Sequence, residues 1–283
     1  MFRSKQFVFI IGEAQAEFTV HAAIIAKQSK ALNALINGSM KEAFAGKAVF
    51  EDIDEDTFIR FCQFAYTGDY TTPDFVQTPA VEMPDIVRPA LLNDGEPVPD
   101  EPVPHGPVPE PAESGWGTIG QKPKKAMKLS KSSRLRQSLH DQFNDTETTS
   151  MSSAARCEVR QNSDPSEDYS TVFIGHAQLY VFADKWGIES LKTLTLFKLH
   201  GTLTTFTLYE ARCPDIVELL RYAFSNTHTP DLVDGVDDLR SLIMLYTACE
   251  VESLIHCPEF LLLIGDGGQL AQDLVKVLIQ RIS

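Results

Sequence analysis

The first twenty residues of the chain contain a short apolar run, Phe7 to Ile11, and a segment in which hydrophobic and polar positions alternate, Glu17 to Val20. Both segments are predicted strands on either side of a turn, and the two-residue period of the second places one of its faces in a core. In the second strand Phe18 and Val20 share one face, and the polar residues between them point the other way.

Helical spacing replaces this alternation from Ile25 onward. The spacing is interrupted near Ser29, which predicts two short helices joined by a bend. The apolar positions of this stripe are Ile25, Leu32, Leu35 and Ile36. After it, Val49 and Phe50 predict a third strand.

A helix with clear limits is predicted after Asp54. Asp54 is a suitable N-cap, and the acidic residues that follow it favour the positive end of the helix dipole. Gly68 is expected to end the helix, because a left-handed residue is common at that position. The apolar stripe between these limits is Phe58, Phe61, Cys62 and Ala65.

The second half of the chain is predicted to be all-helical, since its apolar residues recur at helical spacing. Gly187 separates the first two stripes, and Gly265 to Gly268 predict a turn before the last one. Asp215 and Asp231 are predicted to lie close to helix starts. The stripes are Leu179/Phe182/Ala183/Trp186, Ile188/Leu191/Leu194, Ile216/Leu220/Ala223/Phe224, Leu239/Leu242/Ile243/Tyr246 and Leu270/Leu274/Val277/Leu278.

A proline-rich stretch separates the two parts that are predicted to be ordered. Eleven of the 16 prolines lie between Pro73 and Pro111, and proline lacks the amide donor that a sheet or helix needs. A basic run from Lys122 to Arg136 and a Ser/Thr-rich stretch follow, both poor in apolar residues. We therefore predict that residues 73–168 form a long, largely disordered insert, extended where proline is dense.

Composition narrows the classes of function. A hydrophobic content of 43% suffices for a packed core, and a formal net charge of −14 argues against a general nucleic-acid binder, since phosphate contacts need a basic face. No apolar run approaches the roughly 20 residues that a membrane-spanning helix needs. The five cysteines lack Cys-x-x-Cys spacing, which disfavours zinc and disulfides and indicates a reducing, intracellular setting. Cys249, His256 and Cys257 come closest to a metal cluster, but we expect ordinary buried thiols there.

The order of these segments resembles the BTB (POZ) family. The family pattern His-x-x-x-(Leu/Ile)-x-x-x-Ser-x-x-(Phe/Leu) fits His21, Ile25, Ser29 and Leu32, and the tripeptide Tyr-Thr-Gly at 66–68 resembles the end of its core helix. Residues 179–191 resemble the helix pair that closes the domain. The long insert before that pair is similar to that of short fungal BTB proteins, whose C-terminal helices follow the domain.

The resemblance implies an α+β fold, in which a small mixed sheet flanked by helices is interrupted by the disordered insert and followed by an all-helical C-terminal region. Residues 1–72 would be the first part of the BTB/POZ domain, 73–168 the insert, 169–205 the closing helices and 206–283 the helical extension. A long insert is tolerable, because the free energy of loop closure grows by only about 0.6 kcal/mol per doubling of length.

Two departures from the family pattern bear on oligomeric state. Gln6 stands where the family usually has Asp, and the chain begins almost at its first strand, without the N-terminal elements that swap in many BTB homodimers. We therefore expect a monomer or a weak homodimer.

Three residues are candidates for partner binding. Met40 and Glu42 resemble the hydrophobic-x-Glu pattern by which many BTB adaptors contact a cullin scaffold; Met40 would bury contact area and Glu42 would orient the partner. Tyr66 looks like another position that faces the cullin. The alternatives are an ordinary loop for Met40 and Glu42 and a core-edge aromatic for Tyr66.

The remaining polar candidates are expected to be structural or to act in localisation. His21 is predicted to bond to backbone, and Ser29 to lie at the helix bend. The basic segment resembles a nuclear-import signal, with a solvated linker as the alternative. The residues of that candidate signal are Lys122, Lys124, Lys125 and Lys128.

The expected function is that of a non-enzymatic adaptor that binds other proteins, namely a cullin scaffold of a ubiquitin ligase and an unknown substrate. The alternative is a BTB scaffold or transcription-related oligomeriser in the nucleus without a ligase link. Nucleus and cytoplasm both remain open as locations. We assign no residue to catalysis, to a cofactor or to a metal, and expect neither a specific nucleic acid nor a membrane as partner.

Overall fold

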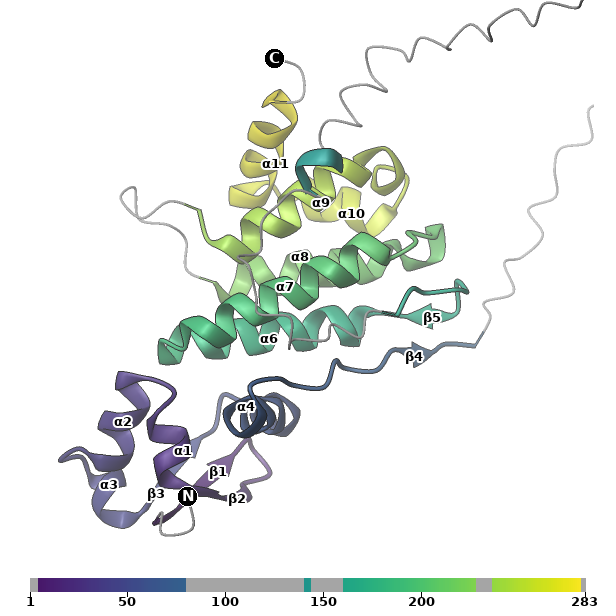
Figure 1. Cartoon of the computed structure of the whole chain (residues 1–283). Coiled ribbons are helices and arrows are strands. Elements are labelled where there is room, and N and C mark those ends of the chain that lie inside the picture. Colours follow the sequence, from purple (N-terminus) through teal and green to yellow (C-terminus); the bar gives the residue numbers. More distant parts are fainter. Residues whose placement is uncertain (1–4, 80–139, 144–159, 228–235, 281–283) are drawn as a thin grey trace, which may run out of the picture.

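The computed structural model describes residues 5–79, 140–143, 160–227 and 236–280. These residues form a mixed α+β structure, with a three-stranded sheet at one end and a stack of longer helices at the other (Figure 1). The predicted class, a small mixed sheet with helices and a helical C-terminal region, is confirmed.

β1 (Gln6–Ile11) is the central strand of the sheet. β2 (Ala16–His21) pairs with it in antiparallel fashion, and β3 (Lys47–Phe50) runs parallel along its other edge. Phe7 and Phe9 of β1 are at most 1% exposed, because alternate residues of a strand point to the same face. The three predicted strands are confirmed, and each is longer than predicted.

Two short helices follow the sheet's first hairpin, as predicted. α1 (Ala22–Ala26) and α2 (Lys30–Asn37) are separated by a bend, and the Ser29 hydroxyl accepts the N–H of Leu32 at 3.1 Å. Ser29 is therefore the N-cap of α2. A third short helix, α3 (Lys41–Ala45), was not predicted.

α4 (Glu55–Thr67) has the predicted limits. The Asp54 carboxylate accepts the N–H of Thr57 at 2.8 Å, and Gly68 ends the helix at a φ of 83°. These caps satisfy backbone groups that a helix leaves without internal partners.

Both ends of the predicted insert are ordered. β4 (Val76–Gln77) pairs antiparallel with β5 (Glu167–Asp168), and residues 140–143 form one helical turn. The prediction that residues 73–168 are largely disordered is therefore wrong for these segments. The rest of the insert, 80–139 and 144–159, lies outside the described residues.

Side-chain bonds to backbone explain why hydrophobic periodicity does not reveal the second ordered end. The Asn162 side chain donates to the Thr207 carbonyl at 2.8 Å and accepts the Thr207 N–H at 2.6 Å. The side-chain amide of Asn162 thereby pairs with both the N–H and the carbonyl of Thr207, much as a neighbouring strand would. This pairing needs no apolar stripe.

The C-terminal part is helical, and each predicted stripe lies in a helix, apart from Ile188, which is the N-cap before its helix. Asp215 is in the first turn of α8, whereas Asp231 lies outside the described residues. α10 was not predicted, because the run from Phe260 to Ile264 is apolar throughout and shows no helical period. The elements are α6 (Ser170–Trp186), α7 (Glu189–Thr205), a 3₁₀ turn (Glu210–Arg212), α8 (Cys213–Asn226), α9 (Asp238–Leu254), α10 (Pro258–Gly265) and α11 (Gly268–Gln280).

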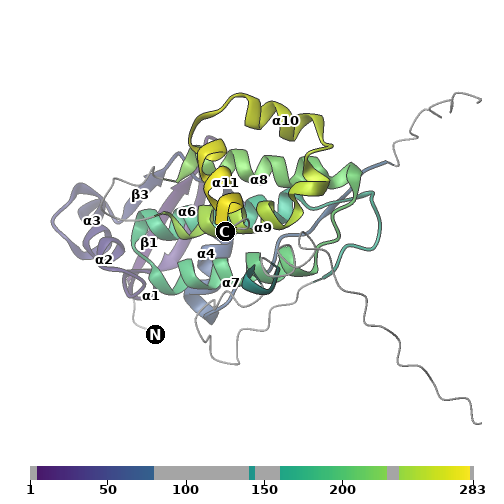
Figure 2. The same ribbon diagram turned by 90° about the horizontal axis from the view of Figure 1, so that it is seen from above.

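α6 and α7 take part in two hydrophobic cores. The sheet core contains the apolar residues of β1 to α4 together with one end of each long helix, and the helical core contains the other ends with α8 to α11. Figure 2 shows α8 lying between α10 and α6. In the sheet core the contributions of α6 and α7 are Leu179, Phe182, Ala183, Leu191 and Leu194; in the helical core they are Val172, Phe173, Ala177, Tyr180, Leu199 and Leu203.

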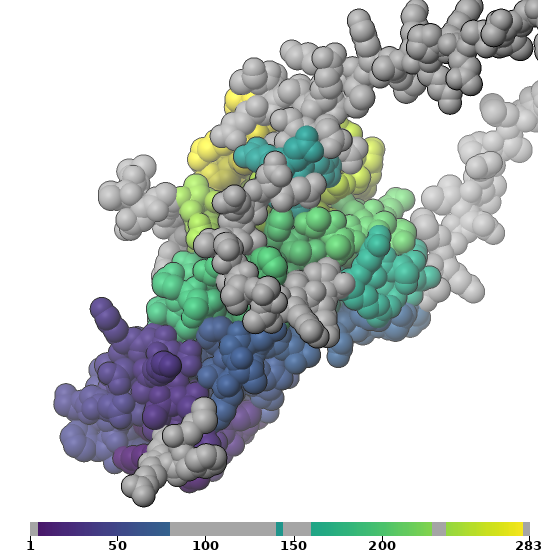
Figure 3. Space-filling model, in the orientation of Figure 1, coloured from purple at the N-terminus to yellow at the C-terminus, as the bar shows by residue number. Residues whose placement is uncertain are grey.

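Close contacts join the chain before the insert to the chain after it. The ring of Phe61 lies 4.8 Å from that of Phe182, and Phe50 stacks on Trp186 at 4.7 Å. A Cβ on Gly175 would lie only 2.5 Å from Cγ of Pro73, so this glycine permits the approach of the two segments. The space-filling view shows the two parts in continuous contact (Figure 3).

Phe182→Ala tests whether the two parts unfold together. We expect the free energy of unfolding to fall by about 3–5 kcal/mol, as for other buried phenylalanines, because Phe182 is 3% exposed and belongs to the sheet core. Circular dichroism, dominated by the helices, and Trp186 fluorescence in a Trp116→Phe background should show the same shifted transition. The control Ser190→Ala, on the exposed side of α7, should change stability by less than about 0.5 kcal/mol. Two separate transitions, with only one of them shifted, would contradict a joint unit.

Candidate docking surface

α3 presents its apolar side chains to solvent. None of its residues is buried; Phe44 is 81% exposed, and Met40, at the N-cap, is 58% exposed. Val49 on the neighbouring β3 is 49% exposed. A helix of five residues has little stability of its own, and its neighbours α2 and β3 hold it in place. We call Met40, Phe44 and Val49 the α3 patch.

Glu42 lies in the first turn of α3, between Met40 and Phe44 in sequence. Its side chain is 24% exposed and pairs with Lys41 at 3.9 Å, while Lys41 itself is 93% exposed. A carboxylate at this position is favoured by the positive end of the helix. The structure thus brings together Met40 and Glu42, as the sequence suggested, and adds Phe44, which the sequence analysis missed.

Tyr66 lies at a different junction, between α4 and the start of α1. Its hydroxyl accepts the His21 N–H at 3.0 Å and lies 2.8 Å from Nδ1 of the His21 ring. The hydroxyl can donate to Nδ1 or accept from it, according to the tautomer of the ring. Tyr66 is 41% exposed. His21 was predicted to bond to backbone through its side chain, and that prediction is wrong because Tyr66 is its partner.

The predicted partner-binding residues therefore form two groups. Met40 and Glu42 share α3, whereas Tyr66 is on α4, which packs on α1 and α6. Figures 1 and 2 both show α3 apart from α4. The candidate import residues Lys122, Lys124, Lys125 and Lys128 lie outside the described residues.

A buried polar cluster joins the sheet end to the long helices. The Tyr70 hydroxyl lies 2.7 Å from Nδ1 of His176, and the Lys198 ammonium donates to the Tyr70 carbonyl at 2.5 Å and pairs with Asp69 at 2.6 Å. Burial, with the positive charges of Lys198 and Arg60, lowers the pKa of His176 to about 3. His176 is fully buried, and its Nε2 has no partner within the described part of the chain. With both rings buried, this cluster joins the sheet end to α6 and α7.

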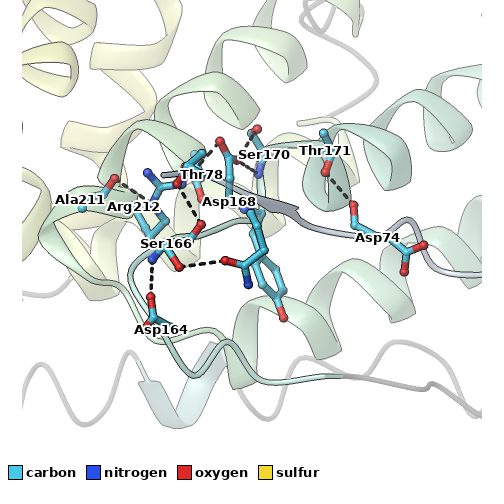
Figure 4. A network of polar contacts seen from close by, with 12 residues as sticks. Asp74, Thr78, Asp164, Ser166, Asp168, Ser170, Thr171, Ala211 and Arg212 are labelled. Atoms are coloured by element: carbon cyan, nitrogen blue, oxygen red, sulfur yellow. Dashed lines mark hydrogen bonds and ion pairs between the residues drawn. The ribbon is translucent and has the colours of Figure 1, made fainter. Parts of the chain in front are cut away.

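A second polar network fixes the return of the chain from the insert (Figure 4). The Asp168 carboxylate accepts the N–H of Ser170 at 2.9 Å and its hydroxyl at 2.6 Å, and it pairs with Arg212 at 3.4 Å. The Thr171 hydroxyl donates to the carbonyl of Asp74 at 2.8 Å. The chain that enters the insert is thereby bonded to the chain that leaves it.

Asp215 is the most perturbed carboxyl near this network. It is 3% exposed and accepts the N–H of Tyr169 at 2.9 Å. Burial raises the pKa of Asp215 to about 7, against the opposing effects of the Tyr169 N–H and Arg212. Hydrophobic periodicity does not reveal that Asp215 is buried, because the residue is polar and precedes the apolar stripe of α8.

The described residues contain no group of three or more His, Cys, Asp or Glu side chains that could hold a metal ion. Cys257 lies 3.2 Å from a Glu259 carboxylate oxygen, and burial raises its pKa. Within the same residues, no helix is long and apolar enough to cross a membrane.

The chain matches no protein-family model, and no curated protein matches it significantly.

His176→Asn tests the buried cluster through pH. The unfolded chain binds a proton on His176 below about pH 6.5, whereas the folded chain does so only near pH 3, so the contribution of His176 to stability is complete above pH 6.5 and is lost as the pH falls towards 3. Between pH 7 and pH 4 the wild type should lose on the order of 3 kcal/mol more than the variant. Urea denaturation at both pH values measures this difference.

Two features make the comparison specific. Asp215 contributes in the opposite direction, since its raised pKa stabilises the fold as the pH falls below 7, but it is present in both proteins. The matched variant Tyr70→Phe removes the bond to His176 and keeps the titrating ring, so it should retain the wild-type dependence on pH. An equal loss in wild type and His176→Asn would contradict the assignment.

Proposed function

We propose that this protein is a non-enzymatic adaptor of the BTB type. The order of elements supports the proposal: a three-stranded mixed sheet with short helices is completed by a helix pair, α6 and α7, that lies more than ninety residues further along the chain. The sequence features that resemble the BTB family lie in these same elements.

The α3 patch is the observation that carries the proposal. Phe44 and Met40, four positions apart, expose large apolar side chains on one side of a helix that contributes nothing to the core, and Glu42 lies between them in sequence. Exposed large apolar groups are typical of interaction surfaces, where a few anchors supply most of the binding energy. A cullin scaffold of a ubiquitin ligase is the partner that we propose for this surface.

The α3 patch can be tested by mixing the purified protein with a cullin N-terminal domain. The two should co-elute in size-exclusion chromatography at micromolar concentrations, and Glu42→Arg or Phe44→Asp should weaken binding by at least tenfold, because each places an unfavourable charge in the contact. Glu17→Arg makes the same charge change at an exposed position of β2, the edge strand opposite β3, and is the matched control that should leave binding unchanged. If the proteins do not co-elute, the cullin link fails.

The second candidate function is a nuclear scaffold or transcription-related oligomeriser without a ligase link. The basic run from Lys122 to Arg136 favours it. Absence of cullin binding, together with nuclear accumulation that is lost when Lys124 and Lys125 are replaced by Ala, would support this candidate over the first.

A further inference from the structure

One turn of the insert, residues 140–143, lies against the C-terminal helices. Phe143 is 2% exposed and belongs to the helical core. Its ring lies 4.7 Å from the ring of His200 on α7 and 5.6 Å from that of Tyr246 on α9. In Figure 1 this turn, coloured teal, lies beside α9.

Two polar contacts fix the orientation of the turn. His200 Nε2 donates to the Phe143 carbonyl at 2.7 Å, which satisfies a backbone group at the end of the turn. His140 Nε2 lies 3.5 Å from a Glu250 carboxylate oxygen on α9. The turn therefore has an aromatic anchor at its end and a histidine three residues earlier, a spacing that places both on one side of a helix.

The receiving face belongs to helices that pack on each other without the turn. α7 contacts α9, and α9 contacts α8 and α11, so His200, Tyr246 and Glu250 are positioned by the helical core. The turn itself is a short segment, and the chain on both of its sides, 80–139 and 144–159, is outside the described residues. The arrangement corresponds to a peptide bound to a helical face, with the peptide joined covalently to its receptor.

We propose that the face of α7 and α9 around His200, Tyr246 and Glu250 is a docking site for a short helical turn with an aromatic anchor, and that the chain fills this site with its own residues 140–143. A single buried ring with a few polar contacts binds only weakly as a separate peptide. A tethered segment has an effective concentration on the order of millimolar, so at micromolar protein it occupies the site of its own chain rather than that of a second copy. A ligand from another protein must displace the turn.

Cleavage by chymotrypsin tests this occupancy in the wild-type protein. Chymotrypsin cuts after aromatic residues, and the insert also contains Trp116, in the part that the sequence predicts to be disordered. We expect cleavage after Trp116 to be at least ten times faster than cleavage after Phe143, measured by mass spectrometry of early products. In a His200→Ala variant the Phe143 site should be cut several times faster, with the Trp116 rate unchanged. Equal rates at the two sites in the wild type would overturn the proposal.

Binding of a synthetic peptide tests whether the face is a site that can exchange its occupant. A fluorescent peptide of residues 136–147 should bind full-length Phe143→Ala at least ten times more tightly than it binds the wild type, because the variant leaves the site open. The same peptide with Phe143→Ala should not bind, and a Met151→Ala protein should behave as the wild type. Equal binding to wild type and variant, or none to the variant, would overturn the proposal.

Light scattering separates this arrangement from exchange between two copies. Between 1 and 100 µM, we expect the wild type to form no dimer. A dimer that the wild type forms and Phe143→Ala does not form is the contrary result. Such a dimer would show that the turn docks on a second copy and would overturn the proposal. Should Phe143→Ala fail to fold, the proteolysis of wild type and His200→Ala still decides between the outcomes.

Discussion

The fold depends on the sharing of α6 and α7 between two hydrophobic cores. A rise of 1.5 Å per residue places Phe173 and Phe182 about 14 Å apart along α6, and each lies in a different core. At the sheet end, Phe61 packs against Phe182 and Phe50 stacks on Trp186. The burial of both rings therefore depends on α6. Because these partners follow the insert in sequence, the first 79 residues lack part of their own core.

This constraint also explains how the chain can accommodate a long insert. The free energy of loop closure changes slowly with length, and the contacts at both ends of the insert offset it. Arg160 lies 4.1 Å over the ring of Phe75, which stacks on Tyr169, so the chain entering the insert and the chain leaving it are held together by stacking as well as by β4 and β5. The turn at 140–143 adds a third attachment, to α7 and α9. The α3 patch, by contrast, lies outside both cores, and it is the surface that the proposed function uses.

The periodic elements and the local helix caps were predictable from the sequence, and the part that depends on polar bonds between distant residues was not. Apolar runs, alternation and helical spacing predicted the strands and most of the C-terminal helices, because burial on one face imposes a period. Residue type at the helix ends predicted the caps at Asp54 and Gly68. The ordered ends of the insert depend on Asn162 and Asp168, whose bonds to distant backbone leave no period in the sequence. Met40 and Glu42 were proposed because they resemble a hydrophobic-x-Glu pattern, whereas Phe44 was not singled out, since an exposed phenylalanine on a helix cannot be told from a buried one without the structure. His21 was predicted to be structural, but its partner Tyr66 is 45 residues away and only the fold brings them together.

Expression of residues 1–79 alone, followed by addition of residues 160–283, measures most directly whether the sheet end is incomplete by itself. The account predicts that the shorter fragment gives the narrow amide dispersion of an unfolded chain in a two-dimensional ¹H–¹⁵N NMR spectrum. It also predicts that the second fragment restores the dispersion of a folded protein when the two are refolded together. A well-dispersed spectrum from residues 1–79 alone, unchanged by the second fragment, would contradict it.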